Sequence, residues 1–257
     1  QVRLGQHYRD GNGVRRSARQ AERWFRAAME DMSLMDGGPA AAYSLGIMYA
    51  EGEGVRKDLE EAEKLWTAAH EAGHMIATTA LGFLFHGNCG PAAGVPDLEK
   101  AVELLRQAAE AGYANAQHNL GIRYAHGTGT ERDLTKAKVW YAKAAKQGHA
   151  GAMVNLANLL AHTEGVAAVP YCVALKRAAA KKGQPNAREA LPKMEKASRS
   201  RCLVCGTTTA LGASLSVCGG CGAYAYCSRA CAKKHWKKGG HKQVCKEAKK
   251  YLPEEGE

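Results

Sequence analysis

The sequence predicts an all-α protein in which a solenoid of helical hairpins is followed by a small metal-stabilised domain. Two observations carry this prediction. One apolar pattern recurs along residues 1–190 at intervals of 35 to 41 residues, which is typical of proteins built from stacked helical units. Seven of the nine cysteines then lie between Cys202 and Cys245, which indicates a second domain of different chemistry.

The composition agrees with a folded chain. Of the 257 residues, 46% are hydrophobic but only 7% are aromatic, so the core must be built largely from alanine and leucine. No run of about 18 apolar residues occurs, which excludes a transmembrane helix. Residues 1–11 also lack the apolar region of a secretory signal. We therefore expect an intracellular protein of the cytoplasm, the nucleus or both.

The first helix of each repeat is marked by a leucine that is followed by a small residue. The five copies are Leu4-Gly5, Leu45-Gly46, Leu81-Gly82, Leu120-Gly121 and Leu156-Ala157. An aromatic residue or leucine follows each leucine after four positions, as expected for one face of a helix. Glycine-rich turns come next at 11–14, 51–55 and 127–130. Because the first copy begins inside its own helix, we expect that upstream sequence is missing.

The second helix of each repeat carries a row of small residues, mainly alanine, that lets paired helices approach closely. The row begins at Ala21, Ala62, Ala101, Ala137 and Cys172. The last four copies end at Gly73, Gly112, Gly148 and Gly183, the residue type expected just past a helix C-terminus. Since a lone hairpin cannot bury its apolar face, neighbouring hairpins are expected to stack.

The combined pattern resembles the Sel-one-like (SLR) repeat, a relative of the tetratricopeptide repeat. Residues 116–148 give that pattern nearly in full. The resemblance implies a right-handed α-solenoid over residues 1–190 that serves as a protein-binding scaffold. Tetratricopeptide repeats fit less well, because their period is about 34 residues and they lack the glycine-rich turn. The third and fifth copies depart from the pattern at residues 88–96 and 162–170, which leaves the loop geometry there open.

Eight candidate metal ligands follow in four closely spaced pairs. They are Cys202 and Cys205, Cys218 and Cys221, Cys227 and Cys231, and His241 and Cys245. A two-residue gap lets both sulfurs of a knuckle reach one ion, and a three-residue gap places two ligands on one face of a helical turn. Eight such ligands make two tetrahedral sites that suit zinc, and four protein ligands per ion indicate a structural role. The spacing leaves sequential and interleaved pairing open.

The cysteine-rich region, residues 202–245, resembles the MYND-type zinc finger. Tyr226-Cys227, Trp236 and His241-Lys242 carry the resemblance beyond the ligand pairs. It implies two short knuckles followed by helices, with interleaved ligands for two structural Zn²⁺ ions. Cys202, Cys205, Cys227 and Cys231 would hold one ion, and Cys218, Cys221, His241 and Cys245 the other. The resemblance also implies docking of a short proline-containing peptide, for which Tyr224, Tyr226 and Trp236 are the candidate residues.

Charge and composition divide the chain into four parts. We expect a solenoid of about five repeats at 1–190, a linker or capping segment at 191–200, the finger at 201–246 and a charged tail at 247–257. Residues 201–250 supply +9 of the net charge of +11, which favours contact with nucleic acid. Zinc-bound thiolates would lower that charge, and no known nucleic-acid motif occurs.

Residues 70–74 match the zinc-protease motif H-E-x-x-H through His70, Glu71 and His74. That chemistry needs both histidines on one helix face. Gly73 is expected to end the helix, so His74 should lie beyond it and the match should be a coincidence. Cys89 and Cys172 are most simply small buried or loop residues.

These features predict a non-enzymatic adaptor with protein partners and no membrane contact. The solenoid would bind one protein, and the finger would bind a short proline-containing peptide of another. Two alternatives stay open: the substrate-recruiting arm of a ubiquitin ligase, and a nucleic-acid-associated, transcription-related zinc-finger protein. A methyltransferase with a MYND finger would need a SET domain, which is not visible in the sequence.

Overall fold

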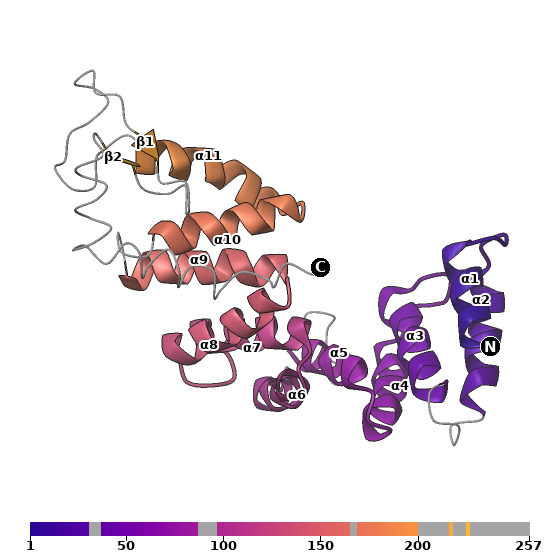
Figure 1. The fold of residues 1–257 in the computed structure, drawn as a ribbon. Coiled ribbons are helices and arrows are strands. Elements are labelled where there is room, and N and C mark those ends of the chain that lie inside the picture. Colours follow the sequence, from indigo (N-terminus) through magenta and orange to yellow (C-terminus); the bar gives the residue numbers. More distant parts are fainter. Residues whose placement is uncertain (31–36, 87–96, 165–168, 200–215, 218–224, 227–257) are drawn as a thin grey trace. The chain divides into compact units, whose positions relative to one another are not determined.

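The computed structural model describes residues 1–30, 37–86, 97–164, 169–199, 216–217 and 225–226. Within these residues the chain forms eleven α-helices and one two-stranded antiparallel sheet (Figure 1). The chain divides into two compact units, residues 1–132 and 133–257, and each is described by itself. The all-α class predicted from the sequence is confirmed for the repeat region.

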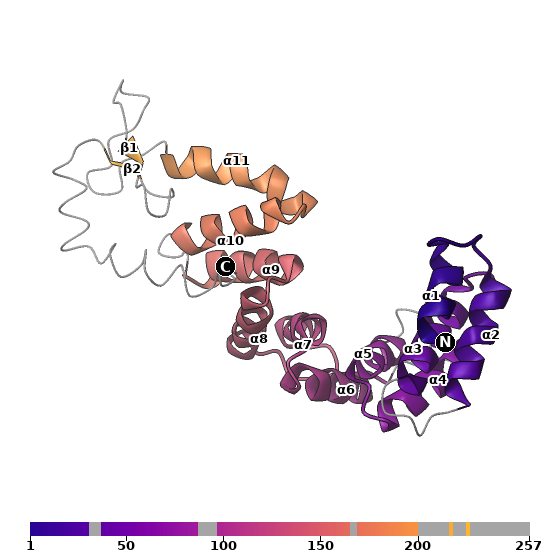
Figure 2. The ribbon, with the colours of Figure 1, turned by 45° about the vertical axis from the view of Figure 1, so that its right-hand side comes forward.

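The first unit is a stack of helical hairpins in which each helix packs against the next (Figure 1 and Figure 2). Its helices are α1 (Val2–Asp10), α2 (Ala18–Met29), α3 (Gly38–Glu51), α4 (Leu59–Glu71), α5 (Met75–Phe85), α6 (Leu98–Glu110) and α7 (Ala114–His126). Odd-numbered helices carry the leucine–glycine pair, and even-numbered helices carry the alanine row.

The second unit continues the alternation with α8 (Leu134–Lys146), α9 (Ala150–Glu164), α10 (Val169–Lys181) and α11 (Pro185–Arg199). Helix α11 therefore includes most of the segment 191–200 that we predicted as a linker or cap, with Pro192 inside it. Strands β1 (Ser216–Val217) and β2 (Ala225–Tyr226) pair so that Ser216 lies opposite Tyr226. The domain boundaries themselves stay predictions.

Side-chain caps and left-handed glycines define the helix ends. Four even-numbered helices begin after a Ser or Asp whose side chain accepts a hydrogen bond from a backbone N–H; these caps are Ser17, Asp58, Asp97 and Asp133. Such caps satisfy N–H groups that the helix itself leaves unpaired. Gly73, Gly112, Gly148 and Gly183 have φ values from 81° to 99°, which confirms their predicted place just past a helix C-terminus.

Small residues let the two helices of a hairpin come into close contact. The alanines at the start of the row, Ala21, Ala62, Ala101 and Ala137, are fully buried. A side chain at Gly46 of α3 would overlap the Trp66 indole of α4, whose Nε1 donates to the Tyr43 carbonyl at 3.1 Å. The predicted alanine and leucine core is confirmed. Cys172 is buried and its thiol donates to the Ala157 carbonyl, while Cys89 lies outside the described residues.

Candidate functional site

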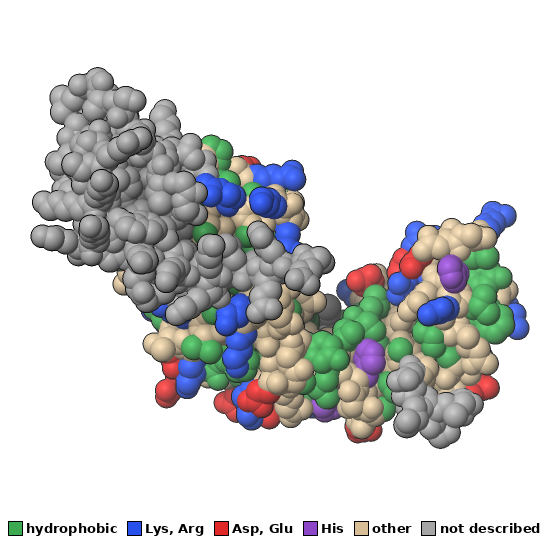
Figure 3. Space-filling view, viewed as in Figure 1, with side chains coloured by type: hydrophobic (Ala, Val, Ile, Leu, Met, Phe, Trp, Pro, Cys, Tyr) green, Lys and Arg blue, Asp and Glu red, His purple; other side chains and the backbone are tan. Residues whose placement is uncertain are grey.

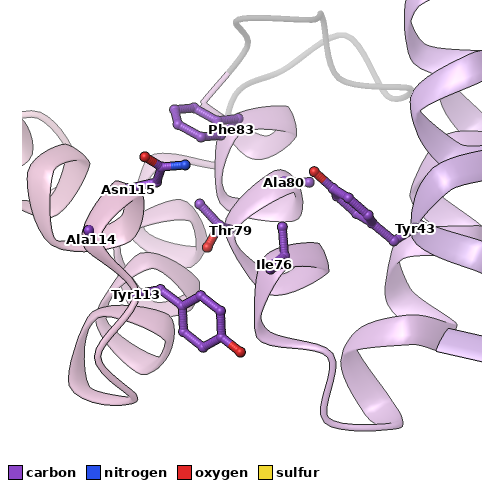
Figure 4. A pocket seen from close by; sticks show the side chains of 8 residues that line it. All are labelled: Tyr43, Ile76, Thr79, Ala80, Phe83, Tyr113, Ala114 and Asn115. Atoms are coloured by element: carbon purple, nitrogen blue, oxygen red, sulfur yellow. The ribbon is translucent and has the colours of Figure 1, made fainter. Parts of the chain in front are cut away.

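A hollow of about 290 Å³ opens on the first unit between α5 and the start of α7, with α3 on its other flank. Its lining consists of Tyr43, Ile76, Thr79, Ala80, Phe83, Tyr113, Ala114 and Asn115. Figure 4 shows the Tyr43 and Tyr113 rings projecting toward α5 from opposite sides. The hollow thus draws on three successive odd-numbered helices, which makes it a product of repeat stacking.

The lining of this hollow is mostly apolar and carries no charged side chain. Ile76 and Tyr113 are 42% and 39% exposed, and they are two of the four large hydrophobic side chains exposed in the described part of the chain. Helix α5 contains no Asp, Glu, Lys or Arg, and hydrophobic side chains gather on the surface over it (Figure 3). Burial raises the pKa of Tyr43, so its hydroxyl stays protonated and can donate a hydrogen bond. The surface is suited to binding rather than to acid–base chemistry.

The two histidines of the H-E-x-x-H motif belong to two different helices, His70 to the end of α4 and His74 to the start of α5. His70 lies in the last turn of α4, with its Nδ1 2.8 Å from the Thr78 hydroxyl. His74 lies beyond Gly73 and caps α5, because its Nδ1 accepts a hydrogen bond from the Ala77 N–H at 3.2 Å. His149 caps α9 in the same way, at 3.0 Å from the Ala152 nitrogen. The predicted position of His74 beyond the helix is confirmed, and the motif does not form a shared metal-binding face.

The histidine caps predict that the repeat domain loses stability as the pH falls from about 7 to about 5. Burial lowers the pKa values of His74 and His149 below that of an unfolded histidine, which is about 6.5. In this window the unfolded chain binds more protons, so stability rises with pH. Protonation also removes the acceptor of each cap and places a positive charge at a helix N-terminus. Urea midpoints followed by helical circular dichroism across this pH range measure the effect.

The control for this prediction is the double variant His74→Asn/His149→Asn. Asparagine is a good cap that does not titrate in this range, so the variant should fold and show a flatter pH dependence. An unchanged pH dependence in the double variant would contradict the role of these two histidines.

All eight predicted metal ligands, and the candidate peptide-binding residues Tyr224 and Trp236, lie outside the described residues. Tyr226 lies in β2, directly before Cys227, and β1 ends at Val217, directly before Cys218. The donor set of seven thiols and one imidazole fits zinc, which prefers sulfur and nitrogen ligands in tetrahedral geometry. The ligand assignment therefore stays a prediction from the sequence.

The residues that line the hollow were not predicted from the sequence. They are distributed over three repeats, and no short motif joins them. One signal was available: residues 75–85 form a charge-free helix among charged ones, and Ala80 stands where the next repeats have Asn119 and Asn155. Comparing repeats position by position would have indicated the site.

Comparisons with known proteins agree with both predicted modules. The Sel1 repeat family model matches residues 1–30, 39–74, 77–113 and 114–149, and the MYND finger model matches residues 202–245. No curated protein sequence matches the chain. None of the helices that the structure describes is both long and apolar enough to cross a membrane.

Two solved structures resemble the fold, each aligning with 76% of this chain at a TM-score of 0.65. One is a protective antigen of uropathogenic Escherichia coli strains that displays an SLR fold; it is 31% identical, and the alignment covers 40% of its length. The other is a Sel1 repeat protein from Oxalobacter formigenes, 28% identical and covered over 75% of its length. The predicted all-helical solenoid is thereby confirmed.

Proposed function

The chain belongs to the Sel1 repeat family, and on that premise we propose that it is a non-enzymatic adaptor. Its solenoid binds one protein, and its MYND finger binds a short proline-containing peptide of another. The observation that carries this proposal is the joining of two protein-interaction modules in one chain. The matched modules are non-catalytic, and the hollow on the first unit offers apolar contact area without a catalytic group.

The finger owes its fold to zinc in this proposal. Cys202, Cys205, Cys227 and Cys231 hold one ion, and Cys218, Cys221, His241 and Cys245 hold the other. Zinc supplies structural cross-links here and no catalytic step, because the protein fills all four positions of each ion. Three features support this assignment: the order of the ligand pairs, the match over residues 202–245 and the β1–β2 pairing directly before two of the cysteines.

The peptide site of the finger is assigned to Tyr224, Tyr226 and Trp236. Within the described residues, β2 pairs with β1 along one edge, and a two-stranded sheet leaves its outer edges able to accept another strand. A bound peptide would gain main-chain hydrogen bonds from β2, and Trp236 would offer its proline a stacking surface. Such a small interface should bind with micromolar to hundreds-of-micromolar affinity.

The expected result of Trp236→Ala is loss of most peptide binding by the full chain, because aromatic anchors dominate small interfaces. The measurement is a titration with a panel of proline-containing peptides. Trp140→Ala is the matched control, since Trp140 lies in α8, where it stacks with Lys143, and its loss should leave peptide affinity unchanged. Equal binding by wild type and Trp236→Ala, or binding of polyanions alone, would argue against a peptide-reading finger.

A further inference from the structure

We propose that the hollow between α5 and α7 anchors one uncharged apolar side chain, the size of leucine or phenylalanine, from an extended segment of a partner protein. This inference rests on the adaptor function proposed above and assigns the chemistry that its solenoid recognises. Three properties of the hollow support it: its size, its lack of charge and the hydrogen-bonding groups in its lining.

The size of the hollow suits a single side chain, and two of its lining residues are small. Ala80 on α5 and Ala114 on α7 both line it. At the position of Ala80 the preceding repeat has the similarly small Ser44, and the following repeat has the larger Asn119. A volume of about 290 Å³ lies just below the range of small-molecule pockets, about 300–1,000 Å³. It accommodates one or two side chains of a protein segment.

The absence of charge selects against acidic and basic segments. None of the lining residues is Asp, Glu, Lys or Arg, and α5 has none along its length, whereas the adjacent α4 and α6 carry five each. A charged side chain placed against this apolar lining would lose hydration without meeting a counter-charge. An apolar side chain would instead gain free energy by burial against Ile76 and Phe83.

Three uncharged polar groups complete the site. These are the hydroxyls of Tyr43 and Tyr113 and the side-chain amide of Asn115, and none has a hydrogen-bond partner among the described residues. A peptide backbone presents one donor and one acceptor per residue, which the amide and the hydroxyls can match. These polar groups therefore suit the main chain of an extended segment, while the apolar lining residues take its side chain.

The chain provides a direct reporter for this site. Its three isoleucines are Ile47, Ile76 and Ile122, and only Ile76 lines the hollow. The experiment is methyl NMR on the full, zinc-loaded chain labelled at isoleucine, titrated with the capped peptide Gly-Ser-Asn-Leu-Asn-Ser-Gly and its Leu-to-Glu and Leu-to-Lys versions. The leucine peptide should shift Ile76 most, saturably and equally at low and high salt. It should bind at least about tenfold more tightly than the charged peptides.

The variant Ala80→Leu fills the hollow and should abolish the shift. Ala161→Leu, the same change at an exposed position of α9, should leave it intact. Unchanged Ile47 and Ile122 signals and helical circular dichroism show that each variant is folded. If Ala80→Leu disrupts folding, the smaller Ala80→Val gives the same test.

Several results would overturn the inference. They are no shift of Ile76 with the leucine peptide, an equal shift with a charged peptide, or persistence of the shift in folded Ala80→Leu. A shift that depends on protein concentration without peptide, together with a doubled molar mass in solution, would instead assign the site to a second copy of the chain. If Ile76 fails to respond while the finger still binds proline peptides through Trp236, the adaptor function stands and this inference alone is wrong.

Discussion

Removal of zinc with a chelator is expected to unfold residues 201–246 and to leave the helical circular dichroism of the repeat domain largely intact. A domain this small has little apolar core of its own. Metal binding therefore supplies its folding free energy, about 10–16 kcal/mol for each structural zinc. Elemental analysis of freshly purified protein should find two ions per chain, and limited proteolysis after chelation should cut within the finger.

Two cysteine variants separate ligands from other thiols. Cys227→Ser removes a proposed ligand and should release zinc. Cys172→Ser should retain both ions, because Cys172 is buried in α10, where its thiol donates to the Ala157 carbonyl. A single ion, or none, in the wild-type protein would contradict the proposed ligand set. Simultaneous loss of helical signal on chelation would show that the two domains do not fold independently.

The repeat fold was predictable because its signals are local and periodic. Each of these signals marks one helix or one turn: the leucine–glycine pair, the alanine row and the terminal glycine. Because they recur in successive repeats, a single sequence is enough to recognise them. Gly73 is an example: its place in the register was enough to separate His74 from α4, and the structure has His74 capping α5.

Features that depend on packing between repeats were not predictable in the same way. The lining of the hollow combines residues of α3, α5 and α7, a combination that no single segment encodes. Helix α11 was not predicted as a helix for another reason. Its basic composition and Pro192 suggested a linker or cap, but the helix packs against α10, and tertiary packing can offset the roughly 3 kcal/mol that a proline costs inside a helix.

The glycine-rich turns have one property that the sequence predicts, their backbone conformation, and one that it does not, their contacts with the preceding repeat. From the sequence, their glycines were interpreted as interhelical loops, and Gly127 and Gly129 do have left-handed φ values of 71° and 73°. The structure adds that the second glycine of such a turn can lie against the preceding repeat. Gly54 lies against Ala18 at the start of α2, and Gly129 lies against Leu98 at the start of α6. Equivalent glycines therefore differ in what surrounds them.

Replacing Gly129 with alanine is expected to destabilise the repeat domain by about 2–5 kcal/mol. Its left-handed backbone costs an alanine about 1–2 kcal/mol. In addition, a methyl group there would overlap the backbone carbonyl of Leu98. Because both partners of that overlap are close to fixed backbone, relief requires the turn to move away from α6, which adds about 1–3 kcal/mol. Urea denaturation followed by helical circular dichroism measures the loss.

Gly13→Ala is the matched control for this prediction. Gly13 occupies the same position of the turn in the first repeat, with a φ of 75°, but nothing lies within 4 Å of the place where its Cβ would be. The control therefore carries the backbone strain alone and should cost about 1–2 kcal/mol. The difference between the two variants measures the contact between the turn and α6. Equal losses would mean that the glycine is required only for its conformation, and that the close approach to Leu98 contributes nothing to the stacking of repeats.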